Sequence, residues 1–528
     1  MELSQVTVFS WTGLKLSAVE TLCCVSSMAV AFVVVLNVVV CFEIALVVLM
    51  RILFPGSGSQ LGIVDTTDGA NAITVPKGSL GLPFLGEIVQ FALSDPVTFS
   101  KPRVEKYGKV FKTSLMGTPT VMVTCPEFAK YVLTDRQQEF QFTFPLYVEK
   151  LLGDGGLGFP PETGPAVHRV AQIFLTPELL RHQVAAVEAM ALETLNSWAA
   201  GETVECVANK SIKFSMNVGV RFILGLEPDH PLSLKLQGLF ETYTGGLRCL
   251  PIRLPGTDFS KALKAKKLIQ EELQIFIKKG AESRKGCQQT DPARTNFLDL
   301  LLDDENIKGG DSELPLHLLS TLFLHFLFAA REPVGYTITW AMKLLWESPE
   351  SLEALTKEND EIRSRKSQGE SLTWTDYKEM KYTFRVIQEL LRISSVANGP
   401  TRRALQDVRF GKHLIPKDWN VMVLFPAIHK NSEYFPNPLR FDPSRFEKAP
   451  KPNTFLPFGS GRHACVGIEL AKLEIFVFLH LLTTQFSWEV IGADVGIVSY
   501  PWPIPRGGLQ IKIRPREWQT QRELSRRF

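Results

Sequence analysis

The sequence has little excess charge, few cysteines and no internal repeat. Its 58 basic and 55 acidic residues give a formal net charge of +3 with histidine neutral, so bulk charge offers no reason to expect nucleic-acid binding. The 8 cysteines, none of them in a Cys-x-x-Cys pair, are too sparse for a disulfide scaffold or for paired zinc ligands. With 45% hydrophobic and 21% charged residues, the chain has the composition of an intracellular or cytosol-facing globular protein.

The N-terminal region contains a long run of uncharged residues, 21–42. About 20 apolar residues cross the hydrocarbon core of a membrane as a helix, and the run is longer than the apolar part of a usual signal peptide. We therefore expect residues 1–53 to form a transmembrane anchor, the alternatives being a cleaved signal or a buried core helix. Lys15 and Arg51 flank the run almost symmetrically, so charge does not fix its orientation.

The rest of the chain has a mostly helical pattern with smaller β regions. Residues 54–75 are polar and glycine-rich, which favours a linker. Two short strands are expected in 109–125, and strand-like composition returns in 409–425. Apolar residues follow a helical period in 184–200, 258–280, 315–346, 348–366 and 379–393. Because strands and helices do not alternate, we do not expect a doubly wound sheet.

The residues with the clearest chemistry surround Cys465. Gly459, Gly461 and Gly467 flank this cysteine directly before an apolar helical pattern. Glycine tolerates a positive φ and lets a flat ligand approach the backbone. A cysteine at a helix N-terminus lies near backbone N–H groups and the positive end of the helix dipole, both of which favour the thiolate. Such a thiolate is how proteins hold haem iron for O–O cleavage; the alternative is a buried structural cysteine in a glycine-rich turn.

This loop resembles the haem-thiolate signature of the cytochrome P-450 monooxygenases, Phe-x-x-Gly-x-(Arg/His)-x-Cys-x-Gly. The pattern is met by Phe458, Gly461, His463, Cys465 and Gly467. The resemblance implies the mostly α cytochrome P-450 fold and haem b (iron protoporphyrin IX) with Cys465 as its axial iron ligand. It also implies that Phe458, Gly461 and Gly467 contact the cofactor and that His463 contacts a haem propionate.

A second family motif lies upstream of the haem loop. Glu389 and Arg392 match the family's Glu-x-x-Arg, and their i, i+3 spacing places both side chains on one helix face. In the family, this pair joins an arginine from a downstream Phe-x-x-Arg-Phe-type segment, which here supplies Arg445. The role implied for the three residues is structural: they hold the chain that leads into the haem loop.

Two further arginines are assigned to haem propionates by the resemblance. Arg402 lies in the segment that offers an arginine to a propionate, with Arg403 as the alternative, and a guanidinium suits bidentate pairing with a carboxylate. Arg169 matches the helix that supplies another, although Pro165 replaces the tryptophan often found there. The similarity covers roughly residues 75–515, so we expect one catalytic domain in 76–515 and a basic tail in 516–528, which could touch the membrane or a reductase.

Several stretches resemble the plant branch of the family that oxidises terpenoid and steroid hormones. They lie in 81–88, 111–117, 254–267, 372–380 and 441–461, and the last is especially like abscisic acid 8′-hydroxylases. The resemblance implies an endoplasmic-reticulum membrane enzyme whose catalytic domain faces the cytosol. It also implies electrons from NADPH through a separate cytochrome reductase, and a small apolar isoprenoid substrate, terpenoid or steroid, that can carry a carboxylate.

The oxygen-activating helix, expected in 315–346, departs from the family pattern. Ala330 and Glu332 are kept, but Pro333 and Val334 replace the two threonines that usually follow the acid. We expect Ala330, Glu332 and Val334 to face the oxygen site, with no hydroxyl on Val334 to help protonate bound oxygen. Pro333 lacks an N–H and clashes one turn back, so it is expected to break the helix.

Three hypotheses stay open for the reaction. The first is hydroxylation, with Glu332, water or a substrate hydroxyl delivering protons. The second is O2-independent haem chemistry, namely isomerisation or dehydration, and the third is a haem-binding relative without catalysis. We favour the first. Substrate contacts are expected from loops: by family position, Val396, Ala397 and Trp502 line the pocket, the alternative being ordinary loop packing.

Overall fold

The computed structural model describes residues 73–516 except 84, 145, 153–170, 173, 250, 284–295, 304–314, 368, 493–495 and 500. The anchor expected in 1–53, most of the linker expected in 54–75 and nearly all of the basic tail lie outside the described residues. Apart from Leu82 and Pro83, the described residues belong to one compact unit. Within these ranges, no helix combines the length and the hydropathy that a membrane span needs.

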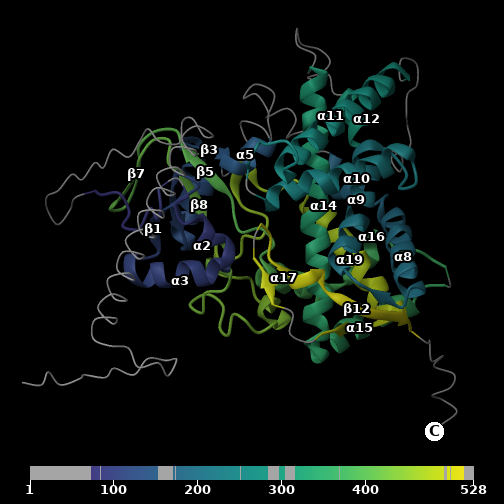
Figure 1. The fold of residues 1–528 in the computed structure, drawn as a ribbon. Coiled ribbons are helices and arrows are strands. Elements are labelled where there is room, and N and C mark those ends of the chain that lie inside the picture. The colour runs from purple at the N-terminus through teal and green to yellow at the C-terminus, as the bar shows by residue number, and fades with distance from the viewer. Residues whose placement is uncertain are drawn as a thin grey trace, which may run out of the picture. The chain divides into compact units, whose positions relative to one another are not determined.

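Helices form most of this unit, as the composition pattern predicts (Figure 1). The longer ones are α3 (Pro96–Tyr107), α8 (Val184–Ala200), α9 (Val207–Leu224), α10 (Pro231–Gly245), α11 (Asp258–Ser283), α14 (Leu316–Trp346), α15 (Pro349–Ser364), α17 (Lys381–Ser394) and α19 (Ile468–Gln485). The shorter ones are α2 (Ile88–Leu93), α4 (Pro126–Lys130), α5 (Leu146–Leu152), α7 (Pro177–Leu180), α12 (Phe297–Asp303), α16 (Trp374–Glu379) and α18 (Phe425–His429). Single turns are η1 (Tyr131–Asp135), η2 (Gln137–Glu139), η3 (Gly246–Arg248), η5 (Pro443–Glu447), η6 (Gly461–His463) and η7 (Arg506–Gly508).

The β content is concentrated in one five-stranded sheet of the described residues. Its order is β1 (Val110–Leu115), β2 (Thr118–Val123), β8 (Asn420–Val423), β5 (Thr401–Ala404) and β3 (Phe140–Thr143). Only the β2–β8 pair in this sheet is parallel. In β8 every residue is buried, as a central strand requires. The register places Arg402 of β5 opposite Phe142 of β3, which brings a predicted haem-binding residue beside an aromatic ring.

Three smaller sheets complete the β structure of the described chain. β12 (Gln510–Pro515) pairs with β4 (Thr203–Val204) and with β9 (Phe486–Ile491). β6 (Val408–Phe410) pairs with β7 (His413–Ile415), and β10 (Ile497–Val498) pairs with β11 (Ile504–Pro505). The expected hairpin in 109–125 and the strands in 409–425 are therefore present, as β1–β2 and as β6, β7 and β8.

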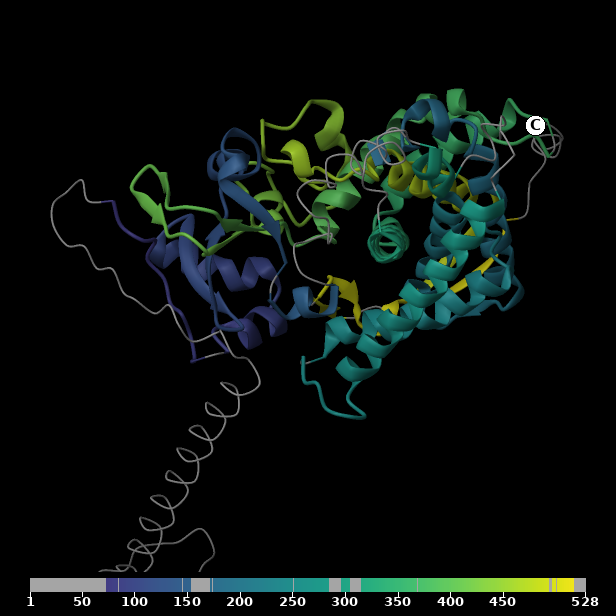
Figure 2. The same cartoon turned by 90° about the horizontal axis from the view of Figure 1, so that it is seen from above.

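Helix α14 lies in the middle of the helical region and is seen nearly end-on in Figure 2. It packs against α9, α11, α17 and α19, and apolar side chains on most of its sides are buried, as expected for a central helix. The helix continues from Leu316 to Trp346 through Pro333, so the expectation that Pro333 breaks it is wrong. The helix tolerates the proline because tertiary packing on both sides of it outweighs the loss of one backbone hydrogen bond, the one that the carbonyl of Ala329 would accept.

Candidate functional site

The loop before α19 folds back on itself around Cys465. The Cys465 N–H donates to the Phe458 carbonyl at 2.9 Å, and the Ala464 N–H donates to the Gly461 carbonyl at 3.0 Å. Gly459 and Gly461 have φ values of 74° and 73°, which glycine adopts without strain. A Cβ placed on Gly461 would lie 1.9 Å from the Leu133 carbonyl oxygen, so this turn has no room for a side chain. The sequence pattern of glycines thus fixes the position of the cysteine.

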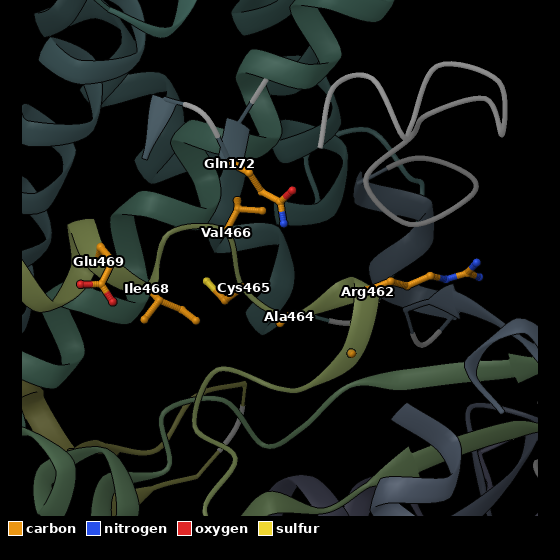
Figure 3. Close-up of a pocket in the computed structure, with 8 residues that line it drawn as sticks. Gln172, Arg462, Ala464, Cys465, Val466, Ile468 and Glu469 are labelled. Carbon is orange, nitrogen blue, oxygen red and sulfur yellow. The ribbon is translucent and has the colours of Figure 1, made fainter. Parts of the chain in front are cut away.

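Cys465 opens into a pocket of about 540 Å³. The pocket is lined by Gln172, Gly461, Arg462, Ala464, Cys465, Val466, Ile468 and Glu469. Figure 3 shows Cys465 beside Ile468, the first residue of α19, and the Arg462 side chain extending away from them. The thiol is unpaired and the residue is exposed, so an iron ion could reach its sulfur without a change of the loop.

The protonation of Cys465 differs from the sequence expectation. The surrounding loop removes water from the sulfur and raises the pKa of the thiol above its ordinary value, although part of the side chain is open to the pocket. A hydrogen bond from the Gly467 N–H acts in the opposite direction. Helix α19 begins only at Ile468, so its dipole acts from a distance and desolvation dominates. A bound metal ion deprotonates a coordinating thiol outright, so the iron itself would supply the charge that favours the thiolate.

Arg402 is a buried cation at the sheet side of the site. The residue is 3% exposed, and no carboxylate among the described residues pairs with it. Its Nη1 donates to the Thr401 carbonyl at 3.1 Å, and its guanidinium lies 4.8 Å from the Phe142 ring centroid. Burial, together with the charge of Arg462, lowers the pKa of Arg402 to about 10. A buried charge without a counter-charge is costly, so this position is prepared for an anion.

The alternative arginine, Arg403, is already paired. Its Nη2 lies 3.4 Å from Glu149 Oε2. Because Arg403 has a carboxylate partner and Arg402 has none within the described ranges, Arg402 is the better candidate for a propionate contact. The sequence alone left these neighbours open, since adjacent residues on a strand point to opposite faces and the pattern did not say which face was which.

His463 approaches the same aromatic ring as Arg402, and Arg462 contacts His463. The His463 ring centroid lies 5.8 Å from that of Phe142, and Arg462 Nε donates to His463 Nε2 at 3.1 Å. The backbone N–H of Arg462 donates to Gln137 Oε1 at 2.8 Å. Sequence reasoning singled out His463 and missed Arg462; the signal was a second basic residue directly before it in the loop. The other predicted propionate ligand, Arg169, lies outside the described residues.

These residues fit a haem. The accessible Cys465 sulfur suits an iron ligand, the glycine turn leaves the backbone bare for a flat macrocycle, and the unpaired Arg402 guanidinium suits a propionate. Gly467 and Phe458 lie in the same loop, and a Cβ placed on Gly467 would lie 3.8 Å from the Cys465 sulfur. Cys465 could therefore hold the iron of a haem, and Arg402 could hold a propionate at the edge of the haem.

The three predicted bracket residues are in contact. Arg392 donates from Nε and Nη2 to the two carboxylate oxygens of Glu389, each at 2.7 Å, and Arg445 Nε donates to Glu389 Oε1 at 3.1 Å. The side chains of Glu389 and Arg392 have no exposed surface. A fully buried carboxylate needs several donors to remain charged, and two guanidiniums supply them. The contact joins α17 to η5, the segment that precedes the haem loop.

His429 joins this bracket to the haem loop and was not identified from the sequence. Its carbonyl accepts from Arg392 Nη1 at 2.9 Å, and its ring Nε2 accepts from the Leu456 N–H at 2.9 Å. The Nδ1 atom lies 3.2 Å from Ser395 Oγ. Burial, with the charge of Arg392, lowers the pKa of His429 to about 3, so the ring is neutral and Nε2 can accept.

The oxygen-helix residues are not all on one face of α14. Ala329 and Pro333 are exposed, while Val334 is 4% exposed and packs in the core. Ala330 lies against α9: a Cβ placed on Gly219 would be 3.2 Å from its Cβ. The expectation that Val334 faces an open site is therefore wrong, whereas Ala330 is half-buried and its role stays a prediction. Each residue along a helix turns the side chain by 100°, so residues four apart lie on one face and direct neighbours do not. The exposed face of α14 therefore carries Ala329 and Pro333 and not Val334.

Glu332 lies beside that open face but is itself buried. Its carboxyl group is fully buried and pairs with Arg331. Desolvation raises the pKa of Glu332, while Arg331 and a hydrogen bond from Thr244 oppose the shift. Its Oε2 has no hydrogen-bond partner in the described part of the chain. Burial therefore favours the protonated carboxyl group more than water would, and one of its oxygens is left without a partner among the described residues.

The predicted substrate residues are placed differently from one another. Trp502 is half-buried and packs against α14, with its ring 5.6 Å from Tyr336 and 6.3 Å from Phe328. Val396 is buried in the core, and Ala397 is exposed. Of the three residues, Trp502 is the one whose ring packs against α14, the helix that carries the exposed Ala329 and Pro333.

A haem-thiolate monooxygenase is the class of protein that this fold and loop define. The family model of cytochrome P-450 matches residues 76–513, and the chain belongs to that family. It is 37% identical to abscisic acid 8′-hydroxylase CYP707A1 of Solanum lycopersicum over 86% of this chain and 93% of that protein. It is 38% identical to abscisic acid 8′-hydroxylase 1 of Arabidopsis thaliana over 84% and 92%.

A solved structure has the same fold. The retinoic acid bound cyanobacterial CYP120A1 superposes with a TM-score of 0.74 and 28% sequence identity, covering 84% of this chain and all of that one. Together these similarities show a cytochrome P-450 monooxygenase close to the abscisic acid 8′-hydroxylases of plants, and the family implies a haem held by a cysteine thiolate.

Proposed function

We propose that the protein hydroxylates a small carboxylated isoprenoid of the abscisic-acid type, using O2 and electrons that a separate reductase passes on from NADPH. The observation that carries this proposal is the similarity to proteins named as abscisic acid 8′-hydroxylases, which extends over most of both chains. The retinoic acid in the solved relative is also an isoprenoid with a carboxylate. Both names point to one substrate class, an apolar body with one acidic end.

Cys465 would be the iron ligand, and the loop residues Phe458, Gly461 and Gly467 would lie against the haem. Arg402 and His463, with Arg169 outside the described residues, are assigned to the propionates. When bound, the haem supplies the iron centre at which dioxygen is activated and one of its atoms is inserted into the substrate. The buried charge of Arg402 orients the cofactor, because only an anionic group offsets its desolvation.

Glu389, Arg392 and Arg445 are proposed to hold the haem loop in place. Their contact with His429 continues to the Leu456 N–H, which lies in the loop itself. Such a buried, fully paired network has one preferred arrangement. The loop can then present Cys465 at a fixed position whether or not substrate is bound.

Glu332 is the proposed holder of a proton next to the oxygen site. Burial raises the pKa of its carboxyl group, which favours the protonated form, and Pro333 on the open face offers no hydroxyl. The hydroxyl of Thr337 does not replace the missing one, since its Oγ1 donates to the Pro333 carbonyl at 2.7 Å. General acid catalysis of this kind requires a group whose pKa lies near the working pH.

The missing hydroxyl also favours a second candidate function. With Pro333 and Val334 in place of both threonines, an O2-independent isomerase or dehydratase would need no proton delivery to bound oxygen. A third, non-catalytic role as a haem-binding protein would need neither electrons nor substrate turnover. All three share the haem site and differ in what they consume.

The arrangement of the whole chain is part of the proposal. Residues 1–53 would anchor the protein in the endoplasmic-reticulum membrane, 54–75 would form a linker, and 76–515 would form the catalytic domain facing the cytosol. The tail, 516–528, would lie near the membrane or the reductase. The long uncharged run at 21–42 supports the anchor.

The test is a reconstituted turnover assay. Full-length protein in vesicles with a plant cytochrome reductase, NADPH and abscisic acid should form a hydroxylated product, with NADPH and O2 consumed alongside it. The Cys465→Ala variant should lose the thiolate signature of the carbon monoxide difference spectrum and all product. Product without O2 from a fatty-acid hydroperoxide would favour the second candidate, and an intact thiolate spectrum without turnover of either substrate would favour the third.

A further inference from the structure

A cluster of polar side chains lies where α10 and η3 meet α14. We call Thr244, Arg248, Arg331, Glu332 and Tyr336 the α10–α14 cluster. Arg331 Nη1 donates to Thr244 Oγ1 at 3.1 Å and also pairs with Glu332. Arg248 Nη2 donates to the Tyr336 hydroxyl at 2.8 Å. Two polar contacts therefore join the segment that ends α10 to the central helix.

The cluster has more positive than negative groups. Desolvation raises the pKa of Tyr336, and the charges that act on its hydroxyl are those of Arg248, Glu332 and Arg331. Two guanidiniums thus face one carboxyl group, and burial also raises the pKa of that carboxyl. Arg331 forms an ion pair with Glu332, whereas no carboxylate in the described ranges pairs with Arg248. Among the described residues, the cluster therefore has one guanidinium more than it has carboxyl groups, and Arg248 is the one without an ion-pair partner.

Arg248 is also the accessible member of the cluster. Tyr336 is 1% exposed and Glu332 has no exposed surface, while Arg248 is exposed. Its Nη2 is oriented by the tyrosine, and its remaining N–H donors have no partner among the described residues. A guanidinium held at one nitrogen keeps its fork in one plane, and that fork matches the two oxygens of a carboxylate.

Aromatic rings surround the tyrosine that holds Arg248. The Trp502 ring lies 5.6 Å from that of Tyr336 and 6.3 Å from that of Phe328, and Phe328 lies 6.1 Å from Tyr243. Tyr243 and Tyr336 are buried, whereas Phe328 and Trp502 are half-buried and form the aromatic wall that a ligand could touch. A ligand that pairs with Arg248 would therefore place an apolar body, rather than a polar one, against its neighbours.

The wall borders the open face of α14. Positions 329, 333 and 336 fall within one stripe of a helix that turns 100° per residue. Ala329 and Pro333 are exposed on that stripe in a helix that is otherwise mostly buried. Tyr336 continues the stripe and holds Arg248. The guanidinium thus lies at one end of the face that lacks the usual threonine hydroxyl.

We propose that Arg248 receives the carboxylate of the substrate and that the hydroxyl of Tyr336 positions it. The apolar body would then lie along Trp502 toward Ala329 and Pro333. This inference rests on the proposed function and deepens it, because it names the group that recognises the acidic end of an isoprenoid. Arg248 would make the protein prefer a free acid over an otherwise identical neutral ester.

The test compares acids with their methyl esters in optical titrations of the purified haem protein. The probes are abscisic acid, retinoic acid and dodecanoic acid, each with its methyl ester. The wild type should bind at least one acid more tightly than its ester. Arg248→Gln should raise the Kd of that acid by roughly 10- to 100-fold, the usual worth of a charge-assisted hydrogen bond, and leave the Kd of the ester within about twofold.

Three variants separate positioning from folding. Arg248→Lys keeps the charge and should retain part of the preference for the acid, and Tyr336→Phe should lose part of it with the ester unaffected. Arg253→Gln removes another exposed cation of the same connection and should change neither ligand. Unchanged ester binding shows that a variant is folded with haem in place.

The outcomes distinguish the inference from the proposed function. Retention of the acid preference in Arg248→Gln, or its loss in Arg253→Gln, would overturn the role of Arg248. An Arg248-dependent preference for retinoic or dodecanoic acid, with no response to abscisic acid, would support the inference while rejecting an abscisic-acid-type substrate. Equal binding of acid and ester by the wild type in all three pairs would overturn the role of Arg248 alone, and no spectral response to any of them would overturn both.

Discussion

Arg392 donates from Nη1 to the backbone carbonyl of His429 at 2.9 Å, and this bond links the buried bracket to the haem loop. On its other side, the His429 ring accepts from the Leu456 N–H at 2.9 Å. Arg392 is also held by both oxygens of Glu389. The order of contacts is therefore carboxylate, guanidinium, histidine and haem loop, so a change at α17 can reach the position of Cys465 without touching it.

The first prediction concerns the His429 ring. His429→Phe keeps a ring that can stack on Phe425, as His429 does, but leaves the buried Leu456 N–H without its acceptor. An unpaired buried donor costs about 1–3 kcal/mol, so we expect the free energy of unfolding in urea to fall by that amount. The haem occupancy should fall with it. His317→Phe changes an exposed histidine and should lower neither; equal losses in both variants would contradict the role given to His429.

The second prediction concerns acid. Burial lowers the folded-state pKa of His429 to about 3 and that of His480 to about 4, below the ordinary value of about 6.5. Between these values the unfolded chain binds protons that the folded chain does not, so stability is complete above about pH 6.5 and falls as the pH falls toward 4. Each histidine contributes a slope of up to about 1.4 kcal/mol per pH unit.

Urea unfolding of the wild type and of His429→Phe at pH 5, 6 and 7 checks this dependence. The variant should lose stability less steeply between pH 6 and pH 5, because it has one fewer histidine that must stay neutral when folded. Parallel slopes for the two proteins would show that His429 does not titrate as its burial requires.

The third prediction concerns the bracket carboxylate. Glu389→Gln leaves two guanidiniums, those of Arg392 and Arg445, without their counter-charge. Breaking a buried ion pair on one side costs about 3–5 kcal/mol, which should appear in urea unfolding and in the yield of haem-loaded protein. Glu379→Gln removes the carboxylate of an exposed pair with Arg365 and should cost less than about 1 kcal/mol.

The fourth prediction separates haem binding from stability at one residue. Arg402→Met removes a buried cation that has no acid partner among the described residues, so the haem-free protein should become equally or more stable by up to a few kcal/mol. The haem-bound protein should release haem to apomyoglobin about tenfold faster or more, because a propionate loses its cation. Arg403→Met, which breaks the pair with Glu149, should not speed haem release; the opposite order would assign the propionate to Arg403.

The sequence predicted the local features of this protein well and the contacts between distant segments poorly. The apolar period of 184–200 became α8 with the same bounds, because a long amphipathic pattern is strong local evidence. The haem loop was found because its glycines and cysteine are close in sequence. Arg462, His429 and Arg248 were not found, because their partners lie on other elements and no spacing links them.

The sequence also did not predict which residues near Pro333 lie on the exposed face of α14. The pattern of the motif suggested that Val334 faces the oxygen site, yet Val334 is buried and Pro333 is exposed. One residue along a helix turns a side chain by 100°, and only the packing of α9 against α14 decides which residue meets the core. A motif therefore located the helix but not the residue that faces the open side.

The last prediction follows from that correction. Pro333→Thr places a hydroxyl on the open face and restores the N–H that the Ala329 carbonyl lacks, so we expect more hydroxylated product per NADPH and less hydrogen peroxide. Val334→Thr buries a hydroxyl in the core, which costs roughly 1–3 kcal/mol unless it finds a partner, and should not improve coupling. Product, NADPH and peroxide are measured in the same reconstituted assay. A gain in coupling from Val334→Thr and none from Pro333→Thr would return the oxygen-site role to position 334, and no gain from either would mean that proton delivery by Glu332 already suffices.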